Sequence, residues 1–162
     1  MKAKYYIDLD VLSRRFDDSK APKILREKNI SARIHDLIYQ AKIRCVCSKA
    51  LNDETRPIKQ PLKRSWLFDL FKKPGFVECI WPTQRMYDLR DRLVKQCGFT
   101  DSQLMDALHV TIAAFSKVDF FVTFNVKDLI DNGRKECIEH FFQKELKHSI
   151  VISTPQQVPA LK

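Results

Sequence analysis

Four short segments, spread over most of the chain, each place an acid or a carboxamide inside an apolar stretch or at its end. The segments are Tyr5–Leu12, Ser48–Glu54, Thr100–His109 and Phe120–Asn125. A carboxylate in apolar surroundings costs free energy unless it is paired or bound to a cation. Distant segments that share this property are typical of a carboxylate metal site, and their oxygen ligands suit Mg²⁺ or Mn²⁺.

The first acids follow an expected strand. Asp8 lies at the carboxyl end of Lys4–Leu9, a short run rich in aromatic and β-branched residues. Ligands of open α/β sheets bind at this edge. An acid here is also a candidate helix N-cap, and of the two neighbouring acids we expect Asp10 to be the cap.

Asp106 gives the sharpest signal. It lies six residues beyond Thr100, which opens a capping box with Gln103, so it is too deep to bond the free amides of the first turn. The helix is apolar nearly all round and is expected to be buried. The carboxylate therefore needs a cation, a hydrogen-bonding network or a salt bridge to Lys or Arg. We expect His109, one turn on, to orient or pack rather than to ligate.

Glu54 and Asn125 are weaker candidates. Glu54 belongs to a polar cluster with Asn52 and Asp53, which is equally consistent with an exposed helical face. Asn125 follows the expected strand Asp119–Thr123, again at a carboxyl end, where a turn or cap residue is also common.

Composition limits the class of protein. The 162 residues indicate a single domain over 1–162. The net charge of +9 favours polyanionic partners such as nucleic acid, an anionic membrane or an acidic protein. The presence of three glycines and the lack of a GxGxxG or Walker pattern argue against a Gly-rich phosphate-binding loop. The basic, aromatic stretch Arg56–Lys73 can follow phosphates, although core or dimer packing is the favoured reading of Trp66 and Phe71.

The cysteines and the apolar segments indicate the compartment. Five cysteines, at positions 45, 47, 79, 97 and 137, do not describe a disulfide framework. Cys45 and Cys47 are expected to be buried, and Cys137 with His140 lacks two further ligands for zinc. No signal peptide and no membrane-spanning stretch is present. We therefore expect a reduced, cytoplasmic protein.

Strands and helices alternate along the chain. The expected strands are Lys4–Leu9, Ile43–Cys47, Phe76–Ile80, Asp119–Thr123 and Ser149–Ser153. The clearest helices are Ser31–Ala41, Thr83–Cys97, Thr100 to about Ser116, and Arg134–Glu145. This alternation predicts an α/β sandwich with a mainly parallel sheet.

Taken together, the motifs resemble the PIN-domain family of metal-dependent ribonucleases, which includes the toxins of many bacterial toxin–antitoxin pairs. The matching segments, in motif order, are Ile7–Leu12, Ser48 with Glu54, Asp106–His109, Phe121–Leu129 and Val151–Pro155. The most specific is the third, a helical Asp-Ala-Leu-His.

The resemblance implies a PIN-like α/β/α sandwich with a roughly five-stranded sheet and acids converging at its carboxyl edge. Asp8 and Asp106 would be metal ligands, Glu54 would be a ligand or would orient the attacking water, and Asn125, with Asp10, would hold a water or a second ion. The implied substrate is single-stranded or looped RNA, cut by hydrolysis. An antitoxin protein and a second copy of the chain are the implied protein partners.

Two alternatives stay open. A PIN fold without activity would bind RNA or a protein partner. Asp8-x-Asp10 followed by Val11-Leu12 also resembles the nucleophile motif of haloacid-dehalogenase-type phosphatases, in which Asp8 would be phosphorylated and Asp10 would act as acid and base. That family also needs a late Gly-Asp or Asp-Asp motif, which this sequence lacks.

Overall fold

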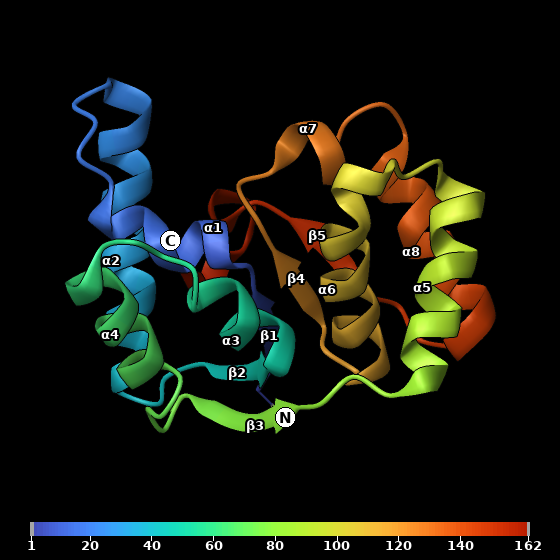
Figure 1. Cartoon of the computed structure of the whole chain (residues 1–162), viewed down its shortest axis with the longest axis horizontal. Helices are drawn as coiled ribbons and strands as arrows, with labels where there is room; N and C mark the ends of the chain where they lie inside the picture. The colour runs from blue at the N-terminus through green and yellow to red at the C-terminus, as the bar shows by residue number, and fades with distance from the viewer. Residues whose placement is uncertain (1, 162) are drawn as a thin grey trace.

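The computed structural model describes residues 2–161 and contains one five-stranded sheet in which all the paired strands are parallel. The strands are β1 (Lys4–Ile7), β2 (Arg44–Ser48), β3 (Phe76–Ile80), β4 (Phe120–Val122) and β5 (Val151–Ser153). Their order is β3-β2-β1-β4-β5, which places β1 and β4 side by side at the centre (Figure 1). The α/β class and the parallel sheet predicted from the sequence are confirmed.

Helices cover both faces of the sheet (Figure 1). They are α1 (Leu9–Ser13), α2 (Pro22–Tyr39), α3 (Lys49–Thr55), α4 (Pro61–Leu70), α5 (Gln84–Cys97), α6 (Leu104–Phe115), α7 (Val126–Leu129) and α8 (Arg134–Leu146), with 3₁₀ turns at Arg14–Phe16, Asp101–Gln103, Pro155–Gln157 and Pro159–Leu161. Because side chains alternate along a strand, Tyr6 packs into the core under α3, α5, α6 and α8, whereas Tyr5 and Ile7 pack into the core under α1, α2 and α4.

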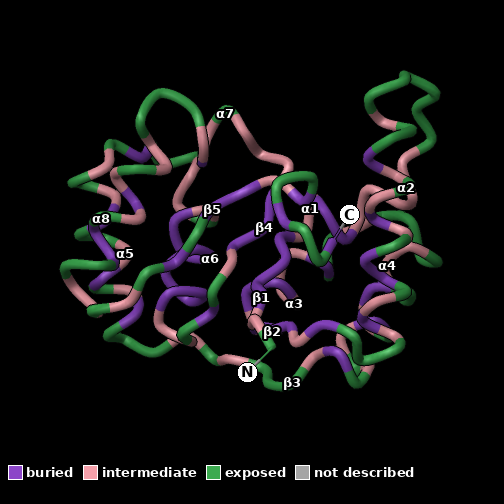
Figure 2. The backbone as a smooth tube through the Cα atoms, turned by 180° about the vertical axis from the view of Figure 1, so that it is seen from behind, coloured by how far each residue is buried: buried purple, intermediate pink, exposed green. Residues whose placement is uncertain are grey.

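Helix α2 is the largest departure from the expected boundaries. It begins at Pro22, nine residues before the predicted start at Ser31. Proline suits the first helical position because its missing N–H would be unbonded there anyway. The added residues are mostly exposed (Figure 2), so they lack the apolar periodicity from which a helix is recognised in sequence.

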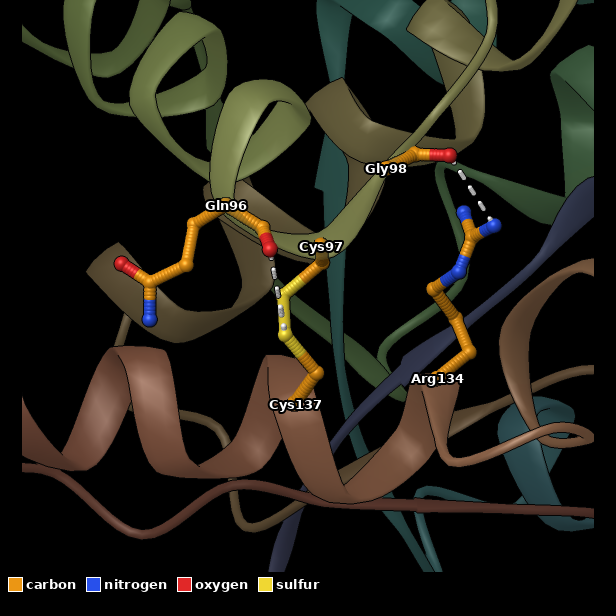
Figure 3. Close-up of a disulfide and its surroundings, with 5 residues drawn as sticks. All are labelled: Gln96, Cys97, Gly98, Arg134 and Cys137. Atoms are coloured by element: carbon orange, nitrogen blue, oxygen red, sulfur yellow. Dashed lines mark hydrogen bonds between the residues drawn. A yellow bond between two sulfur atoms is a disulfide. The ribbon is translucent and has the colours of Figure 1, made fainter.

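A disulfide joins Cys97, at the end of α5, to Cys137 in α8 (Figure 3). The expectation of fully reduced cysteines is therefore wrong, and Cys137 is not available as a zinc ligand. The two cysteines are 40 residues apart, and only the packing of α5 on α8 brings them together. Cys45 and Cys47 are free and buried, as expected. Within residues 2–161 no helix has the length and apolarity needed to cross a bilayer.

Candidate metal centre at the carboxyl edge of the sheet

The predicted site residues meet in one hollow of about 510 Å³, here called the carboxylate hollow. It lies beyond the carboxyl ends of β1 and β4 and is completed by α1, α3 and α6. Its lining residues are Asp8, Leu9, Asp10, Ser13, Arg14, Glu54, Asp106, Phe124 and Asn125. Four acids thus share this hollow with one cationic side chain, and no lysine is among the residues that line it.

Asp8 sits where β1 passes into α1. Its backbone N–H donates to the carbonyl of Val122, so the residue still belongs to the sheet, while its Oδ1 accepts from the Leu9 N–H at 2.8 Å and caps the helix. The expectation that Asp10 is the cap is therefore wrong. Asp8 Oδ2 accepts from the Thr123 hydroxyl at 2.9 Å. Burial raises the pKa of Asp8, although the neighbouring His109 and Thr123 act in the opposite direction.

Asp10 lies two residues further, in the first turn of α1. Its Oδ2 accepts from the Phe124 N–H at 3.0 Å and lies 3.3 Å from the Thr123 hydroxyl, whose single hydrogen cannot serve both acids at once. Its Oδ1 is buried and has no hydrogen-bond partner among the described residues. Burial, followed by the charge of Asp8, raises the pKa of Asp10 to about 8. A proton or a cation must therefore compensate the negative charge of the neighbouring Asp8 and Asp10 carboxylates.

Asp106 and Asn125 also line the hollow. The expectation that Asp106 lies beyond the first helical turn is wrong, because Asp101–Gln103 forms a separate 3₁₀ turn and Asp106 lies in the first turn of α6. The Asn125 amide donates to Asp106 Oδ2 at 3.2 Å, while its carbonyl oxygen accepts from the Asp128 N–H and caps α7. Burial and then the charge of Asp8 raise the pKa of Asp106 to about 6. No ion pair within the described part of the chain involves Asp106. Of the partners that the sequence allows, a basic side chain is therefore not the one present.

Glu54 is held by a buried chain of hydrogen bonds. Its Oε2 lies 2.8 Å from His109 Nε2, and His109 Nδ1 lies 2.6 Å from the Tyr6 hydroxyl. That hydroxyl lies 2.6 Å from Ser48 Oγ, which also accepts from the Leu51 N–H. We assign one consistent direction: Ser48 donates to Tyr6, Tyr6 to His109 Nδ1, and His109 Nε2 to Glu54.

Asp8, Glu54 and His109 each offer an atom to a group whose members lie within 4.8 Å of one another. Both ring nitrogens of His109 are already hydrogen-bonded, so its role in this arrangement is to orient Glu54 rather than to ligate. Burial alone would lower the pKa of His109, but the hydrogen bond to Glu54 and the charge of Asp8 outweigh it, and the pKa is raised.

The donor set fits a hard divalent cation. Carboxylate oxygens are the ligands that Mg²⁺ and Mn²⁺ prefer, and the orphaned Oδ1 of Asp10 is a buried acceptor that lacks a donor. The pKa values of Asp8, Asp10 and Asp106 are all raised, which means that the site favours neutralisation of these acids. Asp8 and Glu54 offer oxygen atoms close enough together to share such an ion, whereas Asp106 lines the same hollow but is not a member of that close group.

Thr123, Tyr6 and Arg14 belong to the site but were not predicted from the sequence. Tyr6 could have been found, because it lies two residues before Asp8 and so shares its side of β1. Comparison with known proteins adds no assignment: no protein-family model matches the chain, and no curated protein is recognisably similar to it.

Proposed function

We propose that the protein is a Mg²⁺- or Mn²⁺-dependent endoribonuclease that hydrolyses single-stranded or looped RNA. The observation that carries this proposal is the convergence of Asp8, Glu54 and Asp106 on one hollow whose lining residues include no lysine. The net charge of +9 is compatible with a polyanionic substrate. The RNA substrate, and an antitoxin or a second copy of the chain as partner, come from the resemblance to the PIN-domain family.

In the proposed reaction Asp8, Glu54 and Asp106 hold the cation. A bound divalent ion supplies Lewis acidity toward a phosphoryl oxygen and lowers the pKa of a water. Alternatively, Glu54, fixed through His109, would orient the attacking water and receive its proton instead of binding the ion. Asn125 keeps the Asp106 carboxylate turned into the hollow. These supporting hydrogen bonds keep the acids in place before the substrate arrives.

The test is cleavage of a fluorescent single-stranded RNA carrying one stem-loop. We expect cleavage with Mg²⁺ or Mn²⁺ and none in EDTA. Asp106→Asn should lower the rate at least ~100-fold, because it weakens a metal ligand. The matched control is Asp101→Asn, an exposed acid just before α6, which should keep the wild-type rate.

Other outcomes would replace the proposal. Cleavage that continues in EDTA would exclude the metal mechanism. Tight RNA binding without cleavage would favour a binding module. Hydrolysis of p-nitrophenyl phosphate with a trapped aspartyl-phosphate at Asp8 would favour the phosphatase.

A further inference from the structure

The carboxylate hollow contains two side chains that the proposed hydrolysis does not use. Arg14 is the one cation that lines it, and Phe124 is the one aromatic ring. The guanidinium carbon of Arg14 lies 5.7 Å from the centre of the Phe124 ring. The backbone N–H of Phe124 donates to Asp10, which anchors the ring beside the carboxylates.

Two acids, Asp17 and Glu27, contact the Arg14 guanidinium. Its Nη1 donates to Asp17 Oδ2 at 3.1 Å, and its Nε lies 2.9 Å from Oε2 of the buried Glu27 in α2. Within residues 2–161 no hydrogen bond or ion pair uses Nη2. A guanidinium carries five N–H groups in a rigid fork, so one edge can be fixed by carboxylates while another binds a ligand.

We propose that Arg14 and Phe124 form a nucleotide subsite beside the metal centre. Arg14 binds the phosphate adjacent to the scissile one, and the Phe124 ring stacks on the base of that nucleotide. The inference rests on the proposed function and narrows its substrate to a strand with an unpaired base at this position.

The chemistry of the hollow favours this ligand. A phosphodiester brings negative charge toward four acids, so it needs a cation from the protein in addition to the metal, and Arg forms directional bonds to phosphate oxygens. An aromatic face accepts any unstacked base, whereas a base inside a duplex is not available to it. The volume of about 510 Å³ lies in the range of small-ligand sites.

Arg14 also has a purely structural reading, in which it only neutralises the buried Glu27. Arg14→Gln would then act by leaving the buried Glu27 with the exposed Lys23, 3.8 Å away, as its remaining cation. Glu27→Gln is the matched control, because it removes the same ion pair and leaves Arg14 beside the hollow. The double variant Arg14→Gln/Glu27→Gln removes the stranded charge together with the proposed phosphate contact.

The experiment measures the Kd of a fluorescent single-stranded RNA by anisotropy, with all variants made in the Asp106→Asn background so that cleavage does not interfere. KM and kcat follow in the otherwise wild-type protein. We expect Arg14→Gln, alone and with Glu27→Gln, to raise Kd and KM about tenfold, with little change in kcat. The slope of log Kd against the logarithm of the salt concentration should become smaller by about 0.7, which is the value for one phosphate contact on a single strand. Glu27→Gln should raise Kd much less than Arg14→Gln does, because Asp17 still holds Arg14 beside the hollow, although it lowers the melting temperature.

Two further variants locate the contacts. Phe124→Leu should weaken binding of normal RNA about fivefold but not of RNA with an abasic nucleotide at the subsite, as stacking requires. Arg15→Gln should bind normally, because Arg15 lies over Trp66 and does not line the hollow. If Glu27→Gln weakens binding as much as Arg14→Gln, Arg14 acts through the fold. If Arg14→Gln leaves Kd and its salt slope unchanged, the subsite is wrong, while metal-dependent cleavage by the wild type would still support the proposed function.

Discussion

The two edges of the sheet carry opposite charge on the same central strands. The carboxylate hollow lies where β1 and β4 end. A second hollow of about 640 Å³, the amino-edge hollow, lies where β1, β2, β4 and β5 begin. It is lined by Lys2, Ala3, Lys4, Arg44, Lys117, Asp119, Phe120, Ser149 and Val151.

The charges at the two edges differ in their partners. At the amino edge, the Lys4 ammonium pairs with Glu78 and donates to the carbonyl of Ser116, and Lys117 donates to the carbonyl of Leu146 at 2.8 Å. At the carboxyl edge the acids face one another, and burial raises the pKa values of three of them. Charges that already have partners support the fold, whereas charges without them favour a ligand from outside.

The largest expected effect is on the free energy of unfolding and concerns the Cys97–Cys137 disulfide. The Cys97–Cys137 disulfide closes a loop that contains Asp106 and Asn125. Chain entropy for a loop of this length predicts that Cys97→Ser/Cys137→Ser lowers the free energy of unfolding by about 4 kcal/mol. A urea titration measures this, and the wild type in excess dithiothreitol should match the double variant.

Cys79→Ser is the control for that titration, because Cys79 is free and exposed. It should change stability by no more than about 0.5 kcal/mol. A loss below about 1 kcal/mol in the double variant would mean that packing of α5 on α8 already fixes this edge without the covalent bond.

The next prediction concerns the pH dependence of the metal-free protein. The raised pKa values of Asp10, to about 8, and of Asp106, to about 6, mean that the folded state binds more protons than the unfolded chain above their ordinary pKa of 3.8. Stability must therefore fall as pH rises through this window. The pKa of buried His35, lowered to about 4 from 6.5, has the opposite effect, but only below pH 6.5. Above pH 6.5 this opposing effect fades, and His109, whose pKa is raised despite burial, mainly by its hydrogen bond to Glu54, acts in the same direction as Asp10.

In EDTA we expect the free energy of unfolding to fall by at least about 2 kcal/mol between pH 6.5 and 8.5, because Asp10 titrating with a pKa near 8 supplies about that much and His109 adds to it. Thermal melts measure this as a drop of several degrees. Saturating Mn²⁺ should abolish the drop, because the cation replaces the protons. Asp10→Asn should flatten the slope without metal, and an unchanged slope in that variant would contradict the raised pKa.

Much of the sheet and of the acid cluster could be predicted from the sequence for one physical reason. Parallel strands are short apolar runs, and their carboxyl ends meet at one edge, so Asp8 and Asn125 could be placed there without knowing any contact. The choice of cap between Asp8 and Asp10 could not be made in this way. It depends on the residue at which β1 leaves the sheet, which is set by pairing with β4 more than a hundred residues away.

The supporting residues were missed because their roles exist only in three dimensions. Thr123 looks like an ordinary strand residue until its hydroxyl is seen between Asp8 and Asp10. Tyr6 looks like core, and it does stack on Phe121, but its hydroxyl continues the chain to Glu54. Both roles depend on which neighbours the fold supplies.

The smallest expected effect tests whether the amino edge is independent of the site. Arg44 begins β2 and lines the amino-edge hollow, about 13 Å from the carboxyl edge, since the five-residue strand rises over four residue steps. At 0.1 M salt this distance exceeds the Debye length of about 10 Å, so Arg44→Gln should change the Mn²⁺ affinity less than about twofold. At 0.01 M salt, where the screening length is about 30 Å, loss of the positive charge should make Mn²⁺ binding measurably tighter.

Isothermal titration at the two salt concentrations measures both values. RNA binding by the same variant should change little at 0.1 M salt, and a tenfold loss there would mean that the amino edge is itself a nucleic-acid contact.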